Sequence, residues 1–347
     1  MDRKLASIQK IEAIKPIPDA DKIEMARVLG WECVVEKGKY KSGDLVIYFE
    51  VDSLIPRVFW SEFLFKNTDK QEYRLRTMTF RGQISQGLIV PFSILDEILH
   101  ENLKDEAIHF ERNIGTDVSA LLKIKKYEPV IPAVISGEAV GLLPSYIPKT
   151  DEMRIQSFPD VLKEIDGEEV YITTKLDGTS MTTYFFEGHF GVCSRNLELK
   201  ENARNTLWNI VKDYNLKEKL CSLTGCFAIQ GEAVGPGIAK NHLNLKKHGW
   251  FVFSVFNIKE GIYLDYLSLI KFCRDLELPT VPVEEITIAK DWSVEQLLER
   301  AKGLYEGTTH QKEGIVLRPV LEKYSQTLKG RMSFKVINND YLLSTGN

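Results

Sequence analysis

A lysine follows directly after a run of strand-forming residues at positions 170–174, and its neighbours suit it for chemistry on a phosphate. Lys175 would be held still at the end of a strand, where its amine can act as a nucleophile. Asp177, two residues on, is expected on the same side of the strand. Gly178 lets the backbone turn close to a bound phosphate. This arrangement favours attack by the lysine on a nucleotide.

Further polar residues lie at the ends of predicted strands or inside them, where apolar packing would not require them. Arg195 follows one predicted strand, and Glu232 ends another. Glu313 opens a third strand, and Lys335 lies inside an apolar one. Each of these residues alone fits a surface charge or a turn. Together with the lysine and aspartate above, they supply two lysines, an arginine and three carboxylates, which are the groups that phosphoryl or nucleotidyl transfer requires.

The first third of the chain, residues 1–125, is predicted to form a small β-barrel of OB type, a fold that often holds oligonucleotides. Short alternating or β-branched runs are separated by glycines and prolines; these expected strands are 8–14, 24–29, 31–35, 45–51 and 87–90. Two basic clusters occur here: Lys37, Lys39 and Lys41, then Arg74, Arg76 and Arg81, with Tyr73 and Phe80 among the latter. The clusters could bind bases and phosphates, or they could form an ordinary solvated face.

Prolines and glycines between residues 126 and 142 favour a linker. The remainder, residues 143–347, is predicted to be an α+β domain dominated by antiparallel sheet. Its expected strands are 180–186, 190–194, 227–230, 251–258, 314–318 and 334–337. Apolar residues at helical spacing predict helices around 207–214 and 266–276. The catalytic candidates all fall in this second domain.

The composition is that of a soluble globular protein, with 347 residues of which 44% are hydrophobic and 27% charged. This length suits two domains. No apolar run approaches the ~18 residues that span a bilayer, and the N-terminus lacks the apolar core of a signal peptide. We therefore expect an intracellular, cytoplasmic monomer without membrane contact. The net charge of −4 gives no overall attraction to nucleic acid, so RNA binding would use local basic patches.

Five ordered segments resemble the motifs of the covalent nucleotidyltransferases, which comprise ATP-dependent DNA and RNA ligases and mRNA capping enzymes. Residues 175–178 resemble the nucleotidyl-lysine motif, 194–196 the phosphate-contact motif, 253–258 the aromatic strand under the base, 313–316 the fourth motif and 334–336 the last. Segments 15–22, 43–49 and 81–88 are similar to the N-terminal OB domain of RNA ligases sometimes called the RNA ligase 5 family. The resemblance implies an OB barrel followed by a nucleotidyltransferase domain of ATP-grasp-like antiparallel sheets with helices.

The resemblance also implies a reaction in three steps. The Lys175 amine attacks the α-phosphorus of ATP, which leaves AMP on the lysine and releases pyrophosphate. AMP then moves to the 5′-phosphate of a nicked or broken RNA end, and a 3′-OH attacks that phosphate and expels AMP. Because a free lysine has a pKa of about 10.4, the attacking amine must be neutralised, and nearby cations would favour this: a divalent metal, Lys335 and Arg195.

Site roles follow from the same resemblance. Asp177, Glu232 and Glu313 would hold Mg²⁺ or Mn²⁺, since all three offer oxygen ligands; Glu232 could instead receive the ribose hydroxyls. Phe256 would stack on adenine, although such a phenylalanine is often only core. The nucleotide-binding set implied by the resemblance is Arg154, Thr174, Lys175, Gly178, Arg195, Glu232, Phe256, Glu313 and Lys335. Within this set, Arg154 would contact the β- and γ-phosphates, or it would be a surface residue near a helix cap.

Two positions depart from the family pattern. Ser333 stands where the last motif often carries a first lysine, and Lys329 or Arg331 could replace its charge. Asn257 stands where the aromatic strand usually continues with aspartate. DNA ligases and capping enzymes place an OB domain after the last motif, whereas only twelve residues follow Lys335 here. An RNA ligase is therefore expected, with a GTP-dependent guanylyltransferase, a DNA ligase and a non-catalytic nucleic-acid-binding protein as alternatives.

Overall fold

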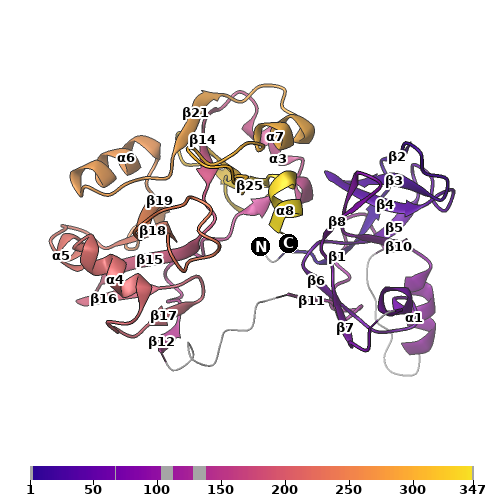
Figure 1. The fold of residues 1–347 in the computed structure, drawn as a ribbon, viewed down its shortest axis with the longest axis horizontal. Coiled ribbons are helices and arrows are strands. Elements are labelled where there is room, and N and C mark those ends of the chain that lie inside the picture. Colours follow the sequence, from indigo (N-terminus) through magenta and orange to yellow (C-terminus); the bar gives the residue numbers. More distant parts are fainter. Residues whose placement is uncertain (1–2, 67, 103–111, 128–137, 346–347) are drawn as a thin grey trace. The chain divides into compact units, whose positions relative to one another are not determined.

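The computed structural model describes residues 3–66, 68–102, 112–127 and 138–345 (Figure 1). Contacts divide the chain into two compact units. The barrel unit comprises residues 1–129, 156–159 and 342–347, and the catalytic unit comprises residues 130–155 and 160–341. The expected linker, 126–142, falls largely on residues 128–137, which lie outside the described residues. None of the described helices combines the length and the apolar character needed to cross a membrane.

The barrel unit is built from short antiparallel strands that form several small sheets. Their orders are β1-β5-β10, β2-β3-β4, β8-β9 and β11-β6-β7. The elements are β1 (Ala6–Lys10), β2 (Ala13–Pro16), β3 (Ile23–Val28), β4 (Trp31–Glu36), β5 (Leu45–Phe49), β6 (Ser53–Pro56), the 3-10 helix η1 (Glu62–Phe65), β7 (Glu72–Arg74), β8 (Thr77–Phe80), β9 (Gln83–Gln86), β10 (Leu88–Pro91), α1 (Ile94–Asn102) and β11 (Lys125–Lys126).

Strand β5 is central to the barrel unit because both of its faces are buried. Ile47 and Phe49 belong to one apolar cluster, and Val46 and Tyr48 belong to another. This explains why 45–49 is a continuous apolar run rather than an alternating one. The OB-type fold is confirmed, although the expected strand 8–14 is divided into β1 and β2, with Ile11 fully buried between them.

A short segment of the later chain, residues 156–159, belongs to the barrel unit. The Gly30 amide donates to the Gln156 carbonyl at 2.9 Å, and the Ser157 hydroxyl donates to the Glu50 carboxylate at 2.6 Å. A Cβ at Gly30 would come within 2.7 Å of the Gln156 backbone, so only glycine fits there. The barrel unit is therefore not confined to the residues before 125.

The catalytic unit contains a seven-stranded sheet in the order β12-β17-β16-β15-β18-β19-β20 and a five-stranded sheet in the order β13-β25-β22-β14-β21. The elements from residue 139 onward are β12 (Ala139–Leu142), β13 (Met153–Arg154), η2 (Ile155–Ser157), α3 (Val161–Ile165), β14 (Glu169–Lys175), β15 (Thr179–Phe186), β16 (His189–Cys193), β17 (Leu197–Leu199), α4 (Thr206–Asp213), α5 (Leu216–Cys221), β18 (Phe227–Val234), β19 (Gly249–Asn257), β20 (Ile262–Tyr263), α6 (Tyr266–Asp275), β21 (Val283–Ile288), α7 (Val294–Arg300), β22 (Gly314–Pro319), β23 (Tyr324–Ser325), β24 (Gly330–Arg331), β25 (Phe334–Ile337) and α8 (Asn339–Thr345). All belong to the catalytic unit except the last residues of η2 and α8, which belong to the barrel unit.

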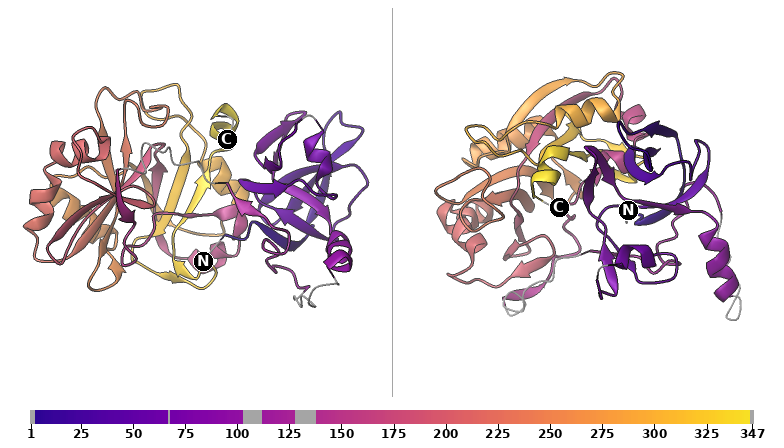
Figure 2. Two further views of the ribbon diagram at one scale, coloured as in Figure 1. Left: turned by 90° about the horizontal axis from the view of Figure 1, so that it is seen from below. Right: turned by 45° about the vertical axis from the view of Figure 1, so that its right-hand side comes forward.

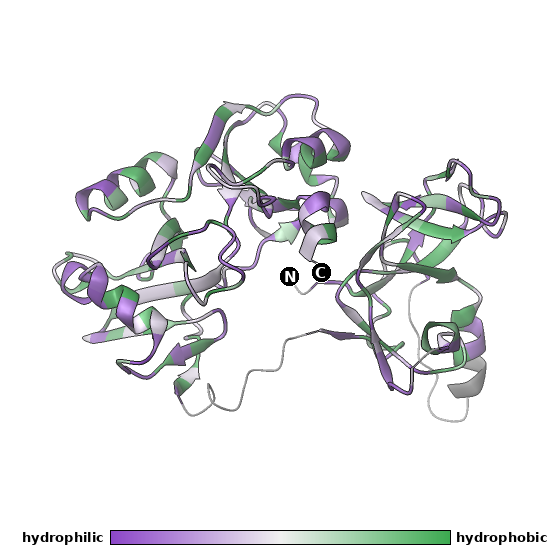
Figure 3. Ribbon diagram, in the orientation of Figure 1, coloured by the Kyte–Doolittle hydropathy of each residue, from purple (hydrophilic) through white to green (hydrophobic). Residues whose placement is uncertain are grey.

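Helices α4, α5 and α6 cover one face of the seven-stranded sheet (Figures 1 and 2). Their apolar residues, such as Leu207, Leu220 and Leu269, join Ile229 and Val252 of the sheet in one buried cluster. Hydrophobic and hydrophilic residues alternate along these helices (Figure 3), as expected when one face packs on a sheet. The expected α+β architecture is confirmed.

The five-stranded sheet places the predicted nucleophile, Lys175, beside Glu313. Strand β14 lies between β21 and β22, and its last pair with β22 joins Lys175 to Gly314. Strand β13 pairs with β25 in parallel and sets Arg154 opposite Lys335. One expectation is wrong: Glu232 does not end its strand but lies inside β18, where it pairs with Ser180 and Phe251.

Candidate active site

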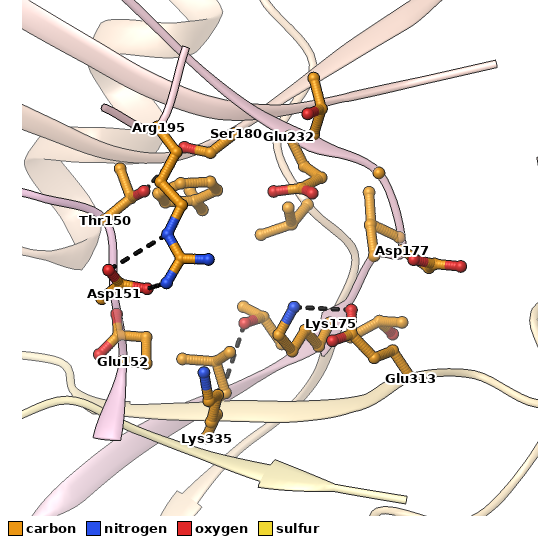
Figure 4. A pocket seen from close by; sticks show the side chains of 18 of the residues that line it. Thr150, Asp151, Glu152, Lys175, Asp177, Ser180, Arg195, Glu232, Glu313 and Lys335 are labelled. Atoms are coloured by element: carbon orange, nitrogen blue, oxygen red, sulfur yellow. Dashed lines mark hydrogen bonds and ion pairs between the residues drawn. The ribbon is translucent and has the colours of Figure 1, made fainter. Parts of the chain in front are cut away.

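A cavity of about 320 Å³ lies between the two sheets of the catalytic unit (Figure 4). Its volume is at the lower end of the roughly 300–1,000 Å³ typical of ligand pockets. Residues 150–152 and side chains from β14, β15, β18, β19, β22 and β25 line it. The predicted site residues that the structure brings together here are Thr174, Lys175, Asp177, Gly178, Arg195, Glu232, Glu313 and Lys335.

The Lys175 amine lies 2.6 Å from Oε2 of Glu313, and both side chains are largely buried. Burial by itself would lower the pKa of this amine, but the charges of Glu313, Glu232 and Asp177 outweigh burial and raise it above the ordinary lysine value. Lys335 and Arg195 were expected to favour the neutral form of the Lys175 amine. In the protein without bound metal this expectation fails, because the pKa of Lys175 is raised. The carboxylates hold Lys175 as an ammonium ion.

The three predicted metal carboxylates do not all face the lysine. In Figure 4, Glu313 and Glu232 point toward the Lys175 amine, whereas the Asp177 carboxylate points away. Asp177 instead lies 2.6 Å from Nδ1 of His242. The expectation of a shared side assumed strand geometry, but β14 ends at Lys175, so alternation does not extend to Asp177. His242 had no sequence signal of its own.

The pKa of Glu232 shows how closely these charges interact. Burial raises this pKa, Lys175 lowers it, and Glu313 and Asp177 raise it, with a net rise to about 7. Within the described ranges, no set of three or more His, Cys, Asp or Glu side chains is arranged ready to hold a metal ion. The carboxylates thus all interact with the positive charge of Lys175, but they do not surround a common point as the ligands of a metal ion would.

Lys335 supplies a second cation to the pocket from strand β25. Burial lowers its pKa, and the neighbouring charges of Lys175 and Arg154 lower it further, to about 7. Arg154 is not among the residues that line the pocket in the described chain. It lies beside Lys335 on the adjacent strand β13, so its direct contact with phosphates stays a prediction.

Arg195 follows β16 and lines the pocket from the other sheet. It forms an ion pair with Asp151, which also lines the pocket. The Thr174 hydroxyl donates to Glu284 on β21 at 2.7 Å.

Gly178 is required for a different reason from the one expected. A Cβ at this position would lie 2.3 Å from the Ala233 carbonyl oxygen, so the glycine lets the backbone approach β18 closely.

The structure does not place Phe256 at the pocket. Phe256 is buried in a cluster with Ile147 and Tyr184, and its ring centroid lies 5.0 Å from that of Tyr263. Phe253 lines the pocket instead. It is the extra residue of a β-bulge, since Ser254 pairs with Gln230 while the next pair joins Val252 to Gly231. Bulges of this kind redirect a side chain next to an active site.

A buried arginine that the sequence did not single out, Arg318, also lines the pocket. Arg318 is 2% exposed and donates to Glu152 at 2.8 Å, to Ser333 at 2.8 Å and to the Phe253 carbonyl at 3.3 Å. Burial by itself would raise the pKa of Glu152, but Arg318 and Arg331 hold it below the ordinary value. The position of Arg318 inside the otherwise apolar run 314–319 was the sequence feature that could have predicted this role.

The structure gives each of the two departures from the motif pattern a role of its own. Neither Lys329 nor Arg331 lines the pocket as described: Lys329 is exposed, and Arg331 pairs with Glu322. Ser333 accepts from Arg318, so Arg318 provides the cation nearest to the expected position. The Asn257 side chain accepts from the Glu260 amide at 3.3 Å and thus caps a turn.

Comparisons with known proteins agree with this site. A family model for RNA ligase matches residues 168–337, and one for an OB-fold domain matches residues 5–92. A search of curated protein sequences found no match. The chain is 34% identical to the Naegleria gruberi RNA ligase solved with PPi, over 99% of both chains and with a TM-score of 0.84.

Two mutants of the same N. gruberi RNA ligase are similarly close. One was solved with ATP and Mn, with 33% identity over 99% of this chain and 98% of that chain and a TM-score of 0.85. The other was solved with AMP and Mn, with 34% identity over 99% of both chains and a TM-score of 0.85. The similarity extends through both units and includes strand β14, which ends at Lys175. The chain therefore belongs to the RNA ligase family.

Proposed function

We propose that this protein is an ATP-dependent RNA ligase that joins 3′-OH and 5′-phosphate ends, with nicks in duplex RNA as its substrates. The observation that carries the proposal is the Lys175 amine at the end of β14, inside a pocket that also contains carboxylates and the cations Lys335 and Arg318. The N. gruberi ligase solved with ATP and with AMP supports the choice of nucleotide. The alternatives of a guanylyltransferase, a DNA ligase and a non-catalytic binding protein are not favoured.

In the first step, the Lys175 ammonium gives up a proton to solvent. Its neutral nitrogen then forms a bond to the α-phosphorus of ATP as the bond to pyrophosphate breaks, and a second proton passes from the nitrogen to solvent. Lys335 and Arg195 line the pocket and can offset the phosphate charge that develops. AMP then passes to the 5′-phosphate of RNA, and the 3′-OH displaces AMP as the new phosphodiester forms. Because Lys175 is held as an ammonium by Glu313, it must be neutralised before it can attack.

The donor set fits a divalent metal. Glu232 and Glu313 point toward the Lys175 amine and offer only carboxylate oxygens, and Mg²⁺ or Mn²⁺ prefers such ligands while keeping several waters. Asp177, which is turned to His242, would have to reorient to join them. Bound near these carboxylates, the metal would supply positive charge that opposes the protonation of Lys175 and stabilises the α-phosphate. The same carboxylates would then no longer favour the ammonium form.

The test uses labelled nucleotide. The protein is incubated with α-³²P ATP or GTP and with Mg²⁺ or Mn²⁺, and covalent label is read on a denaturing gel. We expect label from ATP and not from GTP, followed by sealing of a nicked RNA duplex. Label from GTP alone would identify a guanylyltransferase, and no label with either nucleotide would leave a binding protein.

Phe253 is expected to stack on adenine, because it is the aromatic residue that the bulge directs into the pocket. Phe253→Ala should raise the half-saturating ATP concentration about 5-fold or more, since stacking on a base contributes roughly 1–3 kcal/mol. Phe256→Ala is the matched control, and it should lower the unfolding temperature because it opens a core cavity. An ATP titration and a thermal melt of both variants check this. Equal ATP affinity for wild type and Phe253→Ala would contradict the assignment.

The barrel unit is proposed to bind RNA through its exposed cations. Lys37, Lys41 and Arg76 are among these exposed cations, whereas Arg74 pairs with Asp52 at 2.7 Å. Replacing Lys37, Lys41 and Arg76 with serine should weaken RNA binding and reduce the log-log salt slope by up to about one per lost phosphate contact. Lysine adenylylation should be unchanged, because the pocket lies in the catalytic unit.

Filter binding across a salt series, with AMP labelling in parallel, measures both effects. Arg74→Ser is the comparison, and it should lower stability more than it lowers RNA affinity. An unchanged salt slope for the triple variant would exclude these cations from RNA contact. We also propose that this enzyme acts as a monomer in the cytoplasm.

A further inference from the structure

Tyr305 lies outside the pocket lining but is bonded to the backbone of three site residues. Its hydroxyl donates to the Lys175 carbonyl at 2.9 Å. It accepts from the Asp177 amide at 2.9 Å and from the Glu313 amide at 3.1 Å. A tyrosine hydroxyl has one proton to donate and two lone pairs, so its hydrogen-bonding capacity is fully used.

The Tyr305 hydroxyl bonds backbone groups at the point where the hydrogen-bond ladder of the sheet ends. The ladder between β14 and β22 ends at the pair Lys175 and Gly314, and the backbone on either side then leaves the sheet. Backbone groups next to that last pair would be left without ladder partners. Tyr305 bridges them, joining the exit of β14 to the entry of β22 at the point where Lys175 and Glu313 meet.

Tyr305 is itself held firmly. It is 4% exposed and packs with Leu176, Val234 and Val281. Its amide donates to the His310 carbonyl at 3.0 Å, and the Thr308 hydroxyl donates to its carbonyl at 2.9 Å. The ring therefore presents its hydroxyl from a fixed loop between α7 and β22.

We propose that Tyr305 is a positioning residue for lysine adenylylation, which fixes the Lys175 backbone relative to the backbones that carry Asp177 and Glu313. This inference rests on the proposed ligase function. The step it serves forms the bond between the lysine nitrogen and the α-phosphorus and expels pyrophosphate. A displacement of about 1 Å in such a step can cost on the order of 100-fold in rate. Tyr305 touches neither reacting atom, so it acts through the backbone.

The test compares Tyr305→Phe with Tyr171→Phe. Both changes remove one buried hydroxyl, but the Tyr171 hydroxyl on β14 has no hydrogen-bond partner among the described residues. Single-turnover AMP labelling is measured across an ATP series. For Tyr305→Phe we expect the maximal rate constant to fall about 10- to 100-fold, with the half-saturating ATP concentration and the final labelled fraction unchanged. Tyr171→Phe should behave as wild type.

The labelled fraction separates positioning from partial unfolding. Unfolded protein would lower the final fraction and leave the rate constant of the folded molecules unchanged. A Tyr305→Phe rate constant within about threefold of wild type, or an equal loss in Tyr171→Phe, would overturn the proposal. If Tyr305→Phe is insoluble, Thr308→Val loosens the same loop, and it should show a smaller fall in the same rate constant; an unchanged rate constant would again overturn it. Failure of wild type to label would instead refute the ligase function.

Discussion

Lys175→Ala protein is expected to acquire no covalent AMP from ATP, a loss of at least about 10⁴-fold, as is usual when a nucleophile is removed. The amine is the group at the end of β14 that reaches Glu313 inside the pocket, and alanine leaves nothing to form the phosphorus–nitrogen bond. Lys175→Arg should fail as completely, because a guanidinium stays protonated at any working pH. Denaturing gels with labelled ATP measure the loss.

The control for intact structure is a later step of the same reaction. Lys175→Ala should still join RNA that already carries a 5′-adenylate, since in that step the 3′-OH and not the lysine is the nucleophile. A thermal melt close to that of wild type should accompany it. Normal AMP labelling of Lys175→Ala would show that another residue is the nucleophile.

Glu313→Gln is expected to slow lysine adenylylation by about 100-fold or more at saturating ATP, the scale seen when one catalytic electrostatic group is lost. The amide can still accept a hydrogen bond from Lys175, but it lacks the charge that a divalent metal requires. Glu313→Asp is the matched variant that keeps the charge on a shorter side chain. Adenylylation rates across a metal titration should show a higher half-saturating metal concentration for Glu313→Gln than for Glu313→Asp.

The pH dependence separates two roles of Glu313. Its carboxylate raises the pKa of Lys175, so its removal lowers that pKa and increases the fraction of free amine at a given pH. The rate of Glu313→Gln should therefore begin to rise at a lower pH than that of wild type, while its maximum stays lower. If Glu313 acted only on the lysine pKa, Glu313→Gln would instead be faster than wild type near neutral pH.

The sequence by itself selected most of the polar residues that share the pocket, in their order along the chain. A lysine at a strand end, a glutamate that opens a strand and a lysine inside an apolar strand are local features, because the strands themselves are local patterns. The structure places Lys175, Glu313 and Lys335 in one pocket. The sequence also predicted the two-part fold, because alternating runs separated by turn residues indicate strands even before their pairing partners are known.

Only the tertiary structure decided how side chains at irregular backbone positions point. At the bulge in β19, Phe253 has no pairing partner on β18. This irregularity directs Phe253 rather than Phe256 into the pocket. The end of β14 at Lys175 lets Asp177 turn to His242. Tyr305 and Arg318 meet the site from distant parts of the chain. Period-two alternation holds only while a strand continues, so the sequence pattern could not fix these orientations, which depend on contacts between strands that are far apart in the chain.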